Sequence, residues 1–317
     1  MKRFPYERGV VRLSDGVYAF LFPDGSWGRN NAGLITDQGE SLVVDTLFDP
    51  AHTRLMLDEY RECGALAGPV SRLVITHANG DHWYGSELFP EAEIIATRAC
   101  AREMEKTPPG FLADTMSMAS HLGGLGAFFS RCFSEFDFSR SRPRKPTRLF
   151  EGELEIRVGR KTVRLVEAGP AHTQSDLLVF VEPDDIVFAG DILFYRVTPV
   201  LWEGPLENWM AALDRLLASD AKLFVPGHGP VCGKEGPMAV KGYFQFIQSA
   251  ARAFLDAGVD EATAARKLMG KPFPAWVDPE RSAINLGTVY RHLSGNDRAA
   301  NVPDLFLQMA RLAGFPG

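Results

Sequence analysis

Short apolar runs separated by turn residues dominate the first 235 positions of the chain and predict a fold rich in β-strands. Residues 10–46 have the pattern of a β-meander with a hairpin turn at 37–39. Residues 153–158 alternate between apolar and polar side chains, so we expect them to form a hairpin with 162–166, through a turn at 159–160, with one face in solvent. The predicted strands are 17–22, 31–36, 41–45, 73–75, 93–96, 153–158, 162–166, 177–181, 186–189 and 223–225.

Helical spacing of apolar residues occurs between these strands and after them. It predicts helices over residues 50–63 and 206–218, each of which connects one predicted strand to the next. The pattern becomes wholly helical after residue 236, where we expect one long amphipathic helix followed by helices at 280–293 and 302–313. We found no internal repeat and no linker that would separate two domains.

Residues 98–146 interrupt the strand pattern with methionine, phenylalanine, glycine and serine, and we interpret them as a partly helical insertion. The insertion could line a substrate site with adaptable apolar side chains. The alternative, which is favoured, is that it packs as a helical satellite on the main core. The chain is therefore expected to form one domain over 1–235, with the insertion at about 98–146. Residues 236–317 would form a helical carboxyl-terminal extension packed on the same domain.

Composition changes this picture little. Hydrophobic residues make up 45% of the 317 residues and charged residues 23%, which is typical of a soluble globular protein. The net charge of −6 provides no basic surface for nucleic acid, and no apolar run is long enough to cross a membrane. The amino terminus lacks the apolar segment of a secretory signal, and four scattered cysteines fit reduced thiols. We expect a cytoplasmic protein whose partner is a small-molecule substrate, and the oligomeric state is left open.

The candidate chemistry lies in the loop after the strand at 73–75. That loop carries His77, Asn79, Asp81 and His82 within six residues. Imidazole, carboxylate and amide groups are ligands for a borderline metal ion such as zinc. The alternative is a polar loop with two surface histidines.

Three later loops repeat this pattern, because a metal-ligand side chain follows a short apolar strand and stands beside glycine or proline. They hold His172, Asp191 and His228, so four of the seven histidines occupy such positions. Loops at one edge of a sheet lie close together, and their small residues let the backbone approach closely. We therefore predict a metal centre. His121 has no companion ligand and is expected to have no metal role, and Asp45 could support the metal loop or cap the next segment.

The order of these motifs resembles the metallo-β-lactamase superfamily. The motifs are Thr-His-Ala-Asn-Gly-Asp-His, Ala-His-Thr-Gln-Ser-Asp, Ala-Gly-Asp and Pro-Gly-His-Gly-Pro, and the resemblance covers roughly residues 10–235. It implies an α/β fold, namely an αββα sandwich of two mixed β-sheets with helices outside and metals at one edge. It also implies that the first metal is held by His77 and His172, and the second by Asp81, His82 and His228. Asp191 would bridge the two metals.

The chain departs from the family pattern at Asn79, where a third histidine is usual. An amide oxygen is a poorer zinc ligand than an imidazole nitrogen, so we expect a weakened first site. Asn79 could still ligate the metal, or water could take its place. The cofactor implied is one or two zinc ions, with iron or manganese as alternatives.

The resemblance implies a metal-dependent hydrolase that uses a metal-bound hydroxide on a small ester, thioester, lactone or amide, with Asp81 orienting the water. Two alternatives remain, an iron-dependent oxidoreductase or dioxygenase on the same fold and a non-catalytic metal-binding protein. The sequence does not identify substrate-binding residues. Trp83 and Tyr84 are expected to pack rather than to line the site, the basic run 140–145 to be solvated, and Cys232 to be a small buried residue.

Overall fold

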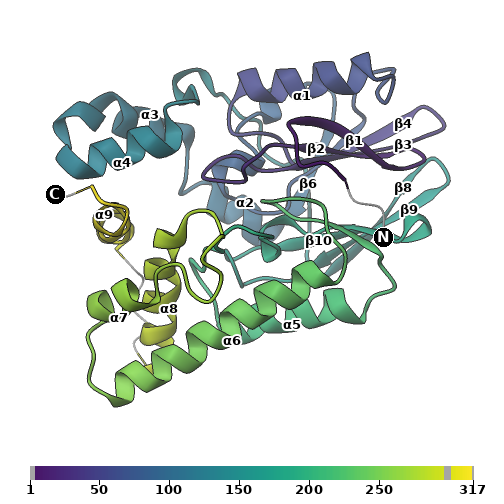
Figure 1. Cartoon of the computed structure of the whole chain (residues 1–317). Helices are drawn as coiled ribbons and strands as arrows, with labels where there is room; N and C mark the ends of the chain where they lie inside the picture. Colours follow the sequence, from purple (N-terminus) through teal and green to yellow (C-terminus); the bar gives the residue numbers. More distant parts are fainter. Residues whose placement is uncertain (1–3, 296–300, 316–317) are drawn as a thin grey trace.

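In the computed structural model, which describes residues 4–295 and 301–315, two mixed β-sheets face each other with helices on their outer sides (Figure 1). The predicted αββα sandwich is therefore confirmed. Residues 1–3, part of the segment expected to lack a signal sequence, fall outside the described ranges. Within the described ranges no helix has the length and apolar character needed to cross a membrane.

The first sheet begins with an antiparallel meander and continues with parallel strands. The hairpin turn at residues 37–39 connects its third and fourth strands, as the sequence predicted. From β4 onward each strand pairs in parallel with the next. In order across the sheet, the strands are β1 (Gly9–Ser14), β2 (Val17–Leu21), β3 (Ala32–Asp37), β4 (Glu40–Val44), β5 (Arg72–Val74), β6 (Glu93–Thr97) and β7 (Arg148–Phe150).

The second sheet consists of antiparallel neighbours with one parallel pair at its edge, β11 and β12. Its order is β12 (Leu223–Val225), β11 (Ile186–Phe188), β10 (Leu177–Val181), β9 (Lys161–Glu167) and β8 (Glu153–Val158). Strands β9, β11 and β12 consequently run in the same direction, so their carboxyl ends lie at the same edge of the sheet.

Side-chain alternation explains how the central strands are buried on both faces. In β10, Leu177, Val179 and Val181 belong to the apolar layer between the sheets. The intervening Leu178 and Phe180 belong to the larger apolar cluster, which also includes the helices. Successive side chains of a strand point to opposite faces, so a continuous apolar run is needed where both faces are covered. This is why these strands appear in the sequence as unbroken apolar runs.

Helices cover the outer face of each sheet. α1 (Pro50–Glu62) lies over the first sheet, and α5 (Leu206–Ala218) and α6 (Glu235–Asp256) lie over the second (Figure 1). α1 begins where Asp49 caps it by accepting a hydrogen bond from the His52 backbone, with Pro50 in the first turn. The carboxyl-terminal segment continues from α6, which contacts both α5 and α8 (Ser282–Leu293).

The insertion forms α2 (Arg98–Met104), α3 (Pro109–Met118) and α4 (Gly123–Phe133), and α4 contacts α9 (Val302–Leu312) of the carboxyl-terminal segment. The sequence did not predict β7, whose side chains are mostly exposed, or α7 (Glu261–Leu268), an eight-residue helix with a weak apolar pattern. The short 3₁₀ helices are η1 (Gly80–His82), η2 (Ser86–Leu88), η3 (Ala119–His121), η4 (Phe138–Arg140), η5 (Glu182–Asp184), η6 (Gly190–Ile192) and η7 (Pro279–Arg281).

Candidate metal centre

The candidate metal ligands lie in loops at the carboxyl ends of strands. His77, Asp81 and His82 follow β5, and the latter two belong to η1. The other three follow strands of the second sheet, and they are His172 after β9, Asp191 in η6 after β11 and His228 after β12. All six side chains are buried. Because these strand ends meet at one edge of the sandwich, side chains that are up to 151 positions apart in the sequence become neighbours.

The structure groups these residues into two neighbouring clusters of potential ligands. One contains His77, His172 and Asp191, and in each cluster the ligand atoms all lie within 4.8 Å of one another. The second contains Asp81, His82 and His228. The family resemblance implied the same two groups of residues, with Asp191 shared between them.

Asp191 lies between the two clusters. Its Oδ2 is 3.3 Å from Nε2 of His172 in the first cluster and 3.5 Å from Nε2 of His228 in the second. Its Oδ1 is 3.3 Å from Nε2 of His82. The carboxylate therefore faces both clusters at once, as expected of a bridging residue.

Each of the four histidines is held by its Nδ1, which leaves Nε2 directed toward the centre. Nδ1 of His172 donates to the Val200 carbonyl at 2.5 Å, and Nδ1 of His228 donates to the Gly25 carbonyl at 3.0 Å. A donor role at Nδ1 leaves a lone pair on Nε2 of the neutral ring. Partners of this kind fix the tautomer and the orientation of histidines that bind metals.

Asp45 orients the other two histidines, His77 and His82. Its Oδ2 accepts from Nδ1 of His82 at 2.8 Å and from the Thr76 hydroxyl at 2.8 Å, and the oxygen of that hydroxyl accepts from Nδ1 of His77 at 3.0 Å. Its Oδ1 accepts from the Thr76 backbone N–H at 2.7 Å. Asp49, and not Asp45, caps the following helix. Asp45 thus supports the loop and does not cap α1.

Unpaired polar atoms test whether this site fits a cation. Among the described residues, Nε2 of His77, Nε2 of His82 and Oδ1 of Asp191 are buried without a hydrogen-bond partner. An unpaired polar atom in a protein interior costs free energy, so natural structures seldom leave one alone. Nitrogen and carboxylate oxygen are ligands for divalent metal ions. The donor set fits such an ion.

The charges of the site also fit a cation. Burial lowers the pKa of His172 to about 4, which keeps this imidazole neutral at physiological pH. Burial raises the pKa of Asp191, but the surrounding histidines outweigh it and hold the pKa well below its usual value. Burial also raises the pKa of Asp81, while His82 and His228 lower it further than burial raises it. The site therefore keeps two ionised carboxylates in its interior.

Asn79 is half-buried and faces the first cluster. Its Nδ2 lies 3.0 Å from Nε2 of His172. Since Nδ1 of His172 donates to a carbonyl, Nε2 of that ring accepts the hydrogen bond from the amide. In this arrangement Asn79 uses the lone pair that a metal ion in the first cluster would need.

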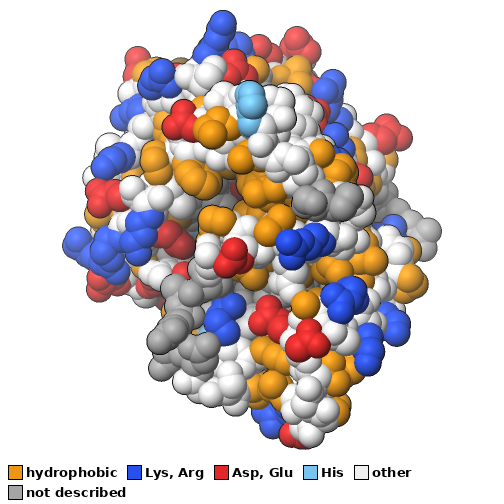
Figure 2. Space-filling view, turned by 90° about the vertical axis from the view of Figure 1, so that its left-hand side faces the viewer, with side chains coloured by type: hydrophobic (Ala, Val, Ile, Leu, Met, Phe, Trp, Pro, Cys, Tyr) orange, Lys and Arg blue, Asp and Glu red, His pale blue; other side chains and the backbone are white. Residues whose placement is uncertain are grey.

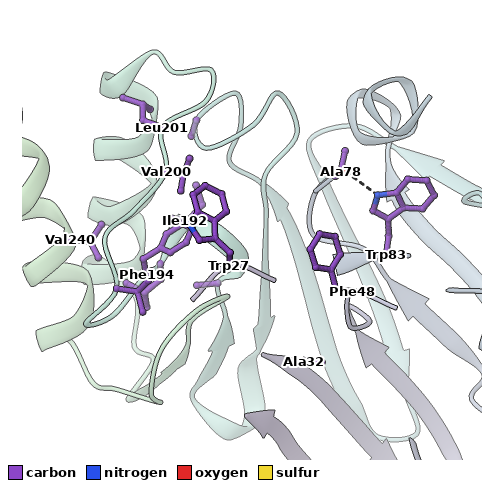
Figure 3. Close-up of a cluster of buried hydrophobic side chains, with 14 of the residues drawn as sticks. Trp27, Ala32, Phe48, Ala78, Trp83, Ile192, Phe194, Val200, Leu201 and Val240 are labelled. Atoms are coloured by element: carbon purple, nitrogen blue, oxygen red, sulfur yellow. Dashed lines mark hydrogen bonds between the residues drawn. The ribbon is translucent and has the colours of Figure 1, made fainter. Parts of the chain in front are cut away.

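A cavity of about 660 Å³ opens directly over the two clusters, and Asp81, His172, Asp191 and His228 line it. Aromatic side chains form much of its wall. In Figure 3, Trp27, Phe194 and Val200 lie on one side and Phe48 on the other. The aromatic residues that line the cavity are Trp27, Phe48, Tyr84, Phe111, Phe133, Phe194, Trp202 and Phe306.

Other sequence predictions have mixed outcomes. Trp83 is buried and donates to the Ala78 carbonyl, away from the cavity (Figure 3). Tyr84 packs as expected but also lines the cavity. Cys232 is buried as expected, and His121 is exposed and belongs to neither cluster. The basic run 140–145 does not line the cavity, and Lys145 pairs with Glu105.

Sequence reasoning missed cavity residues that follow α2 or come from η7, α8 and α9. The cations on the cavity wall are Lys106, Arg281 and Arg291, and the apolar residues from α9 are Val302, Leu305 and Phe306. The helical periodicity of 302–313 predicted the helix itself. Helical periodicity does not predict which distant loops the helix will contact.

A sandwich that gathers four histidines and two aspartates at one edge has the side chains to hold divalent metal ions. The family model described as the metallo-beta-lactamase superfamily matches residues 25–228, well over half of the chain. The chain belongs to this superfamily, and the resemblance drawn from the sequence is confirmed.

Two curated relatives show how far similarity extends. The 2,4-dinitroanisole O-demethylase subunit alpha of Nocardioides sp. (strain JS1661) is 25% identical over 236 residues, covering 71% of this chain and 56% of that protein. The Beta-lactamase-like protein 2 homolog of Caenorhabditis elegans is 30% identical over 81 residues, 26% of each protein. The chain thus spans about half of the first relative and a quarter of the second.

Solved structures share the fold at low identity. The sec-alkylsulfatase Pisa1 from Pseudomonas sp. superimposes with a TM-score of 0.67 at 15% identity, over 94% of this chain and 52% of that chain. A metallo-beta-lactamase family protein from Thermus thermophilus gives a TM-score of 0.64 at 21% identity, over 90% and 95% of the two chains. These similarities establish the architecture.

Proposed function

We propose that this chain is a zinc-dependent hydrolase that cleaves a small ester, thioester, lactone or amide. One observation carries the proposal. Nε2 of His77, Nε2 of His82 and Oδ1 of Asp191 are buried without hydrogen-bond partners, and Asp191 also lines the open cavity. Superfamily membership supports metal-dependent hydrolysis in general, and the four imidazole side chains of the clusters favour zinc over a hard cation such as magnesium.

A bound zinc ion supplies Lewis acidity and lowers the pKa of water toward ~7. His77 and His172 would hold one ion, and Asp81, His82 and His228 would hold the other, with Asp191 shared. The ionised Asp81 lines the cavity beside His228, with its Oδ2 3.3 Å from Nε2 of that ring, and is placed to orient the attacking water.

The reaction needs no oxidant or further reactant. Water adds to the carbonyl carbon, the bond from that carbon to oxygen, sulfur or nitrogen breaks, and the leaving group departs with a proton. The aromatic walls of the cavity place apolar surface beside the bond that breaks.

Metal content and turnover together test this proposal. Elemental analysis of the isolated protein is expected to show zinc, and chelation followed by zinc addition is expected to remove and restore hydrolysis of one of the four substrate types. Iron accompanied by oxygen consumption would instead establish the oxidoreductase alternative. A fully loaded protein without turnover on any of them would point to a non-catalytic metal-binding protein.

O-demethylation of an aryl methyl ether is the second candidate function, and one comparison favours it. The curated relative that matches most of this chain is named for O-demethylation of 2,4-dinitroanisole. Hydrolysis of such an ether adds water and yields a phenol and methanol, which would use the same water and the same centre. Including 2,4-dinitroanisole in the substrate screen distinguishes the two candidates, because only the second predicts release of the phenol.

Asn79→His is expected to tighten metal binding in the first cluster at least about tenfold, because an imidazole replaces an amide that competes for the His172 lone pair. Competition with a chromogenic chelator measures the two metal affinities separately. Gln174→His is the matched control, since Gln174 also lines the cavity but donates to Glu203. Unchanged affinity in Asn79→His would show that the asparagine does not weaken the first site.

A further inference from the structure

Two helices outside the αββα sandwich form part of the cavity wall. α3 of the insertion contributes Phe111 and Leu112, and α9 of the carboxyl-terminal segment contributes Val302, Leu305 and Phe306. In Figure 1 both helices lie on the same side of the molecule, beyond the ends of the sheets. The metal-ligand residues are on strand-end loops, so the wall and the centre come from different parts of the fold.

Phe306 of α9 is held in an aromatic cluster that joins distant segments. Its ring centroid lies 4.8 Å from Phe129 of α4, 5.7 Å from Trp27 and 6.0 Å from Trp202. Tilted and edge-to-face aromatic pairs at such separations stabilise one another and hold the rings in defined orientations. Three of these rings, those of Phe306, Trp27 and Trp202, also line the cavity.

Aromatic rings also line the cavity next to the metal-ligand residues. Phe194 stacks on His228 with 5.1 Å between ring centroids and 3° between ring planes. Phe48 pairs with Tyr84 at 5.7 Å, and both rings line the cavity. An aromatic surface is therefore present both at the outer helices and at the centre where the chemistry takes place.

The outer part of this wall exposes apolar surface to solvent. Phe111 is 59% exposed and Val302 is 44% exposed, although both line the cavity. Within α3, Asp114 is the only charged residue. Figure 2, which views this side of the molecule, shows hydrophobic side chains gathered near the centre of the face with charged side chains around them. Apolar surface of this kind is typical of binding sites, and here it is continuous with the wall of the cavity over the metal-ligand clusters.

We propose that the substrate carries an aromatic ring system, which is held between α3 and α9 while the bond to be cleaved lies at the metal centre. This inference rests on the proposed function for the reaction, but not for the ring-binding site itself. Phe306 and Phe111 are then residues that determine specificity, whereas Asp81 acts on the reacting group. Leucine would fill space at positions 306 and 111, but it cannot stack on a flat ring.

Binding of an unreactive probe tests the ring site without any turnover. 2-Naphthylmethanol and its decahydro counterpart have the same carbon skeleton and hydroxyl, and they differ in aromaticity. Calorimetry on the metal-loaded protein is expected to show at least about fivefold tighter binding of the aromatic alcohol, because stacking adds to apolar burial. Equal affinity for the two alcohols would overturn the proposal.

Variants locate the preference on the two helices. Phe306→Leu and Phe111→Leu are each expected to reduce the aromatic preference at least about threefold, with thermal unfolding showing an intact fold. Met118→Leu is the matched control, because Met118 is on α3 with 54% exposure but does not line the cavity. Phe111 is so exposed that its replacement leaves the core intact, which keeps the test valid if Phe306→Leu unfolds. A preference that survives both substitutions would place the ring elsewhere and refute the proposal.

Turnover separates this inference from the proposed function. Methyl 2-naphthylacetate and its decahydro counterpart share a leaving group, so the ratio of their kcat/KM values is expected to follow the binding preference. Aromatic-selective binding that depends on Phe306, without hydrolysis of any ester, would support the ring site and contradict the hydrolase. Equal hydrolysis of both esters together with equal binding would support the hydrolase and contradict the ring site.

Discussion

Asp81→Ala is expected to lower kcat/KM by about 10³-fold or more, which corresponds to about 4 kcal/mol of lost transition-state stabilisation. The substitution removes the carboxylate of the second cluster, where Oδ2 of Asp81 lies 3.3 Å from Nε2 of His228 and 3.8 Å from Nε2 of His82. It also removes the group placed to orient water. Steady-state kinetics with zinc in excess on the ester that the wild-type protein cleaves provides the measurement.

The fold should survive this change, since Asp81 supports the site and not the apolar layers. Asp58→Ala on α1 is the matched control, because Asp58 is exposed and its ion pair with Arg61 is at the surface. We expect that control to stay within about twofold of the wild-type rate. Activity of Asp81→Ala within about tenfold of wild type would remove Asp81 from the catalytic role.

Asp45→Asn is expected to weaken metal binding by about 10- to 100-fold, although Asp45 belongs to neither ligand cluster. The carboxylate accepts from Thr76 at both oxygens and from His82 at one of them. An amide would place one NH₂ group against these donors, so His82 or Thr76 would lose its acceptor. The histidines of both clusters would then be less firmly oriented. Chelator competition measures the affinity.

Asparagine is the informative substitution because of the backbone at position 45. Asp45 has a φ of +62°, a conformation that asparagine tolerates better than most residues, so Asp45→Asn changes the hydrogen bonds with little backbone strain. Asp185→Asn is the control, because Asp185 has a φ of +55° and pairs with Lys222 away from the centre. If both variants kept wild-type metal affinity, the orienting role of Asp45 would be disproved.

Much of the fold could be predicted because the relevant signals are local. The strand that ends before His77 is a short apolar run followed by glycine and asparagine, and short apolar strands followed by glycine or proline also precede His172 and His228. Burial on both faces produces continuous apolar strands, which the sequence displays directly. Strand β7 escaped detection because its residues are mostly exposed and have no apolar run to mark them.

The metal-ligand residues were more predictable than the cavity wall for a physical reason. Ligand chemistry restricts the residue types, so His77, Asp81 and Asp191 stand out from their surroundings even before any contact is known. Apolar wall residues such as Phe306 have the same composition and spacing as any core residue. The packing of α9 against the distant α4 places Phe306, and the structure shows that this ring lines the cavity.

The placement of α3 and α9 has a consequence for how such a protein could diversify. The candidate metal ligands lie on loops that follow sheet strands, whereas selectivity would reside in two appended helical pieces. Exchanging those pieces would leave the strand ends intact. New compounds could then be accepted through recombination of peripheral segments, with the ion-binding chemistry inherited unchanged.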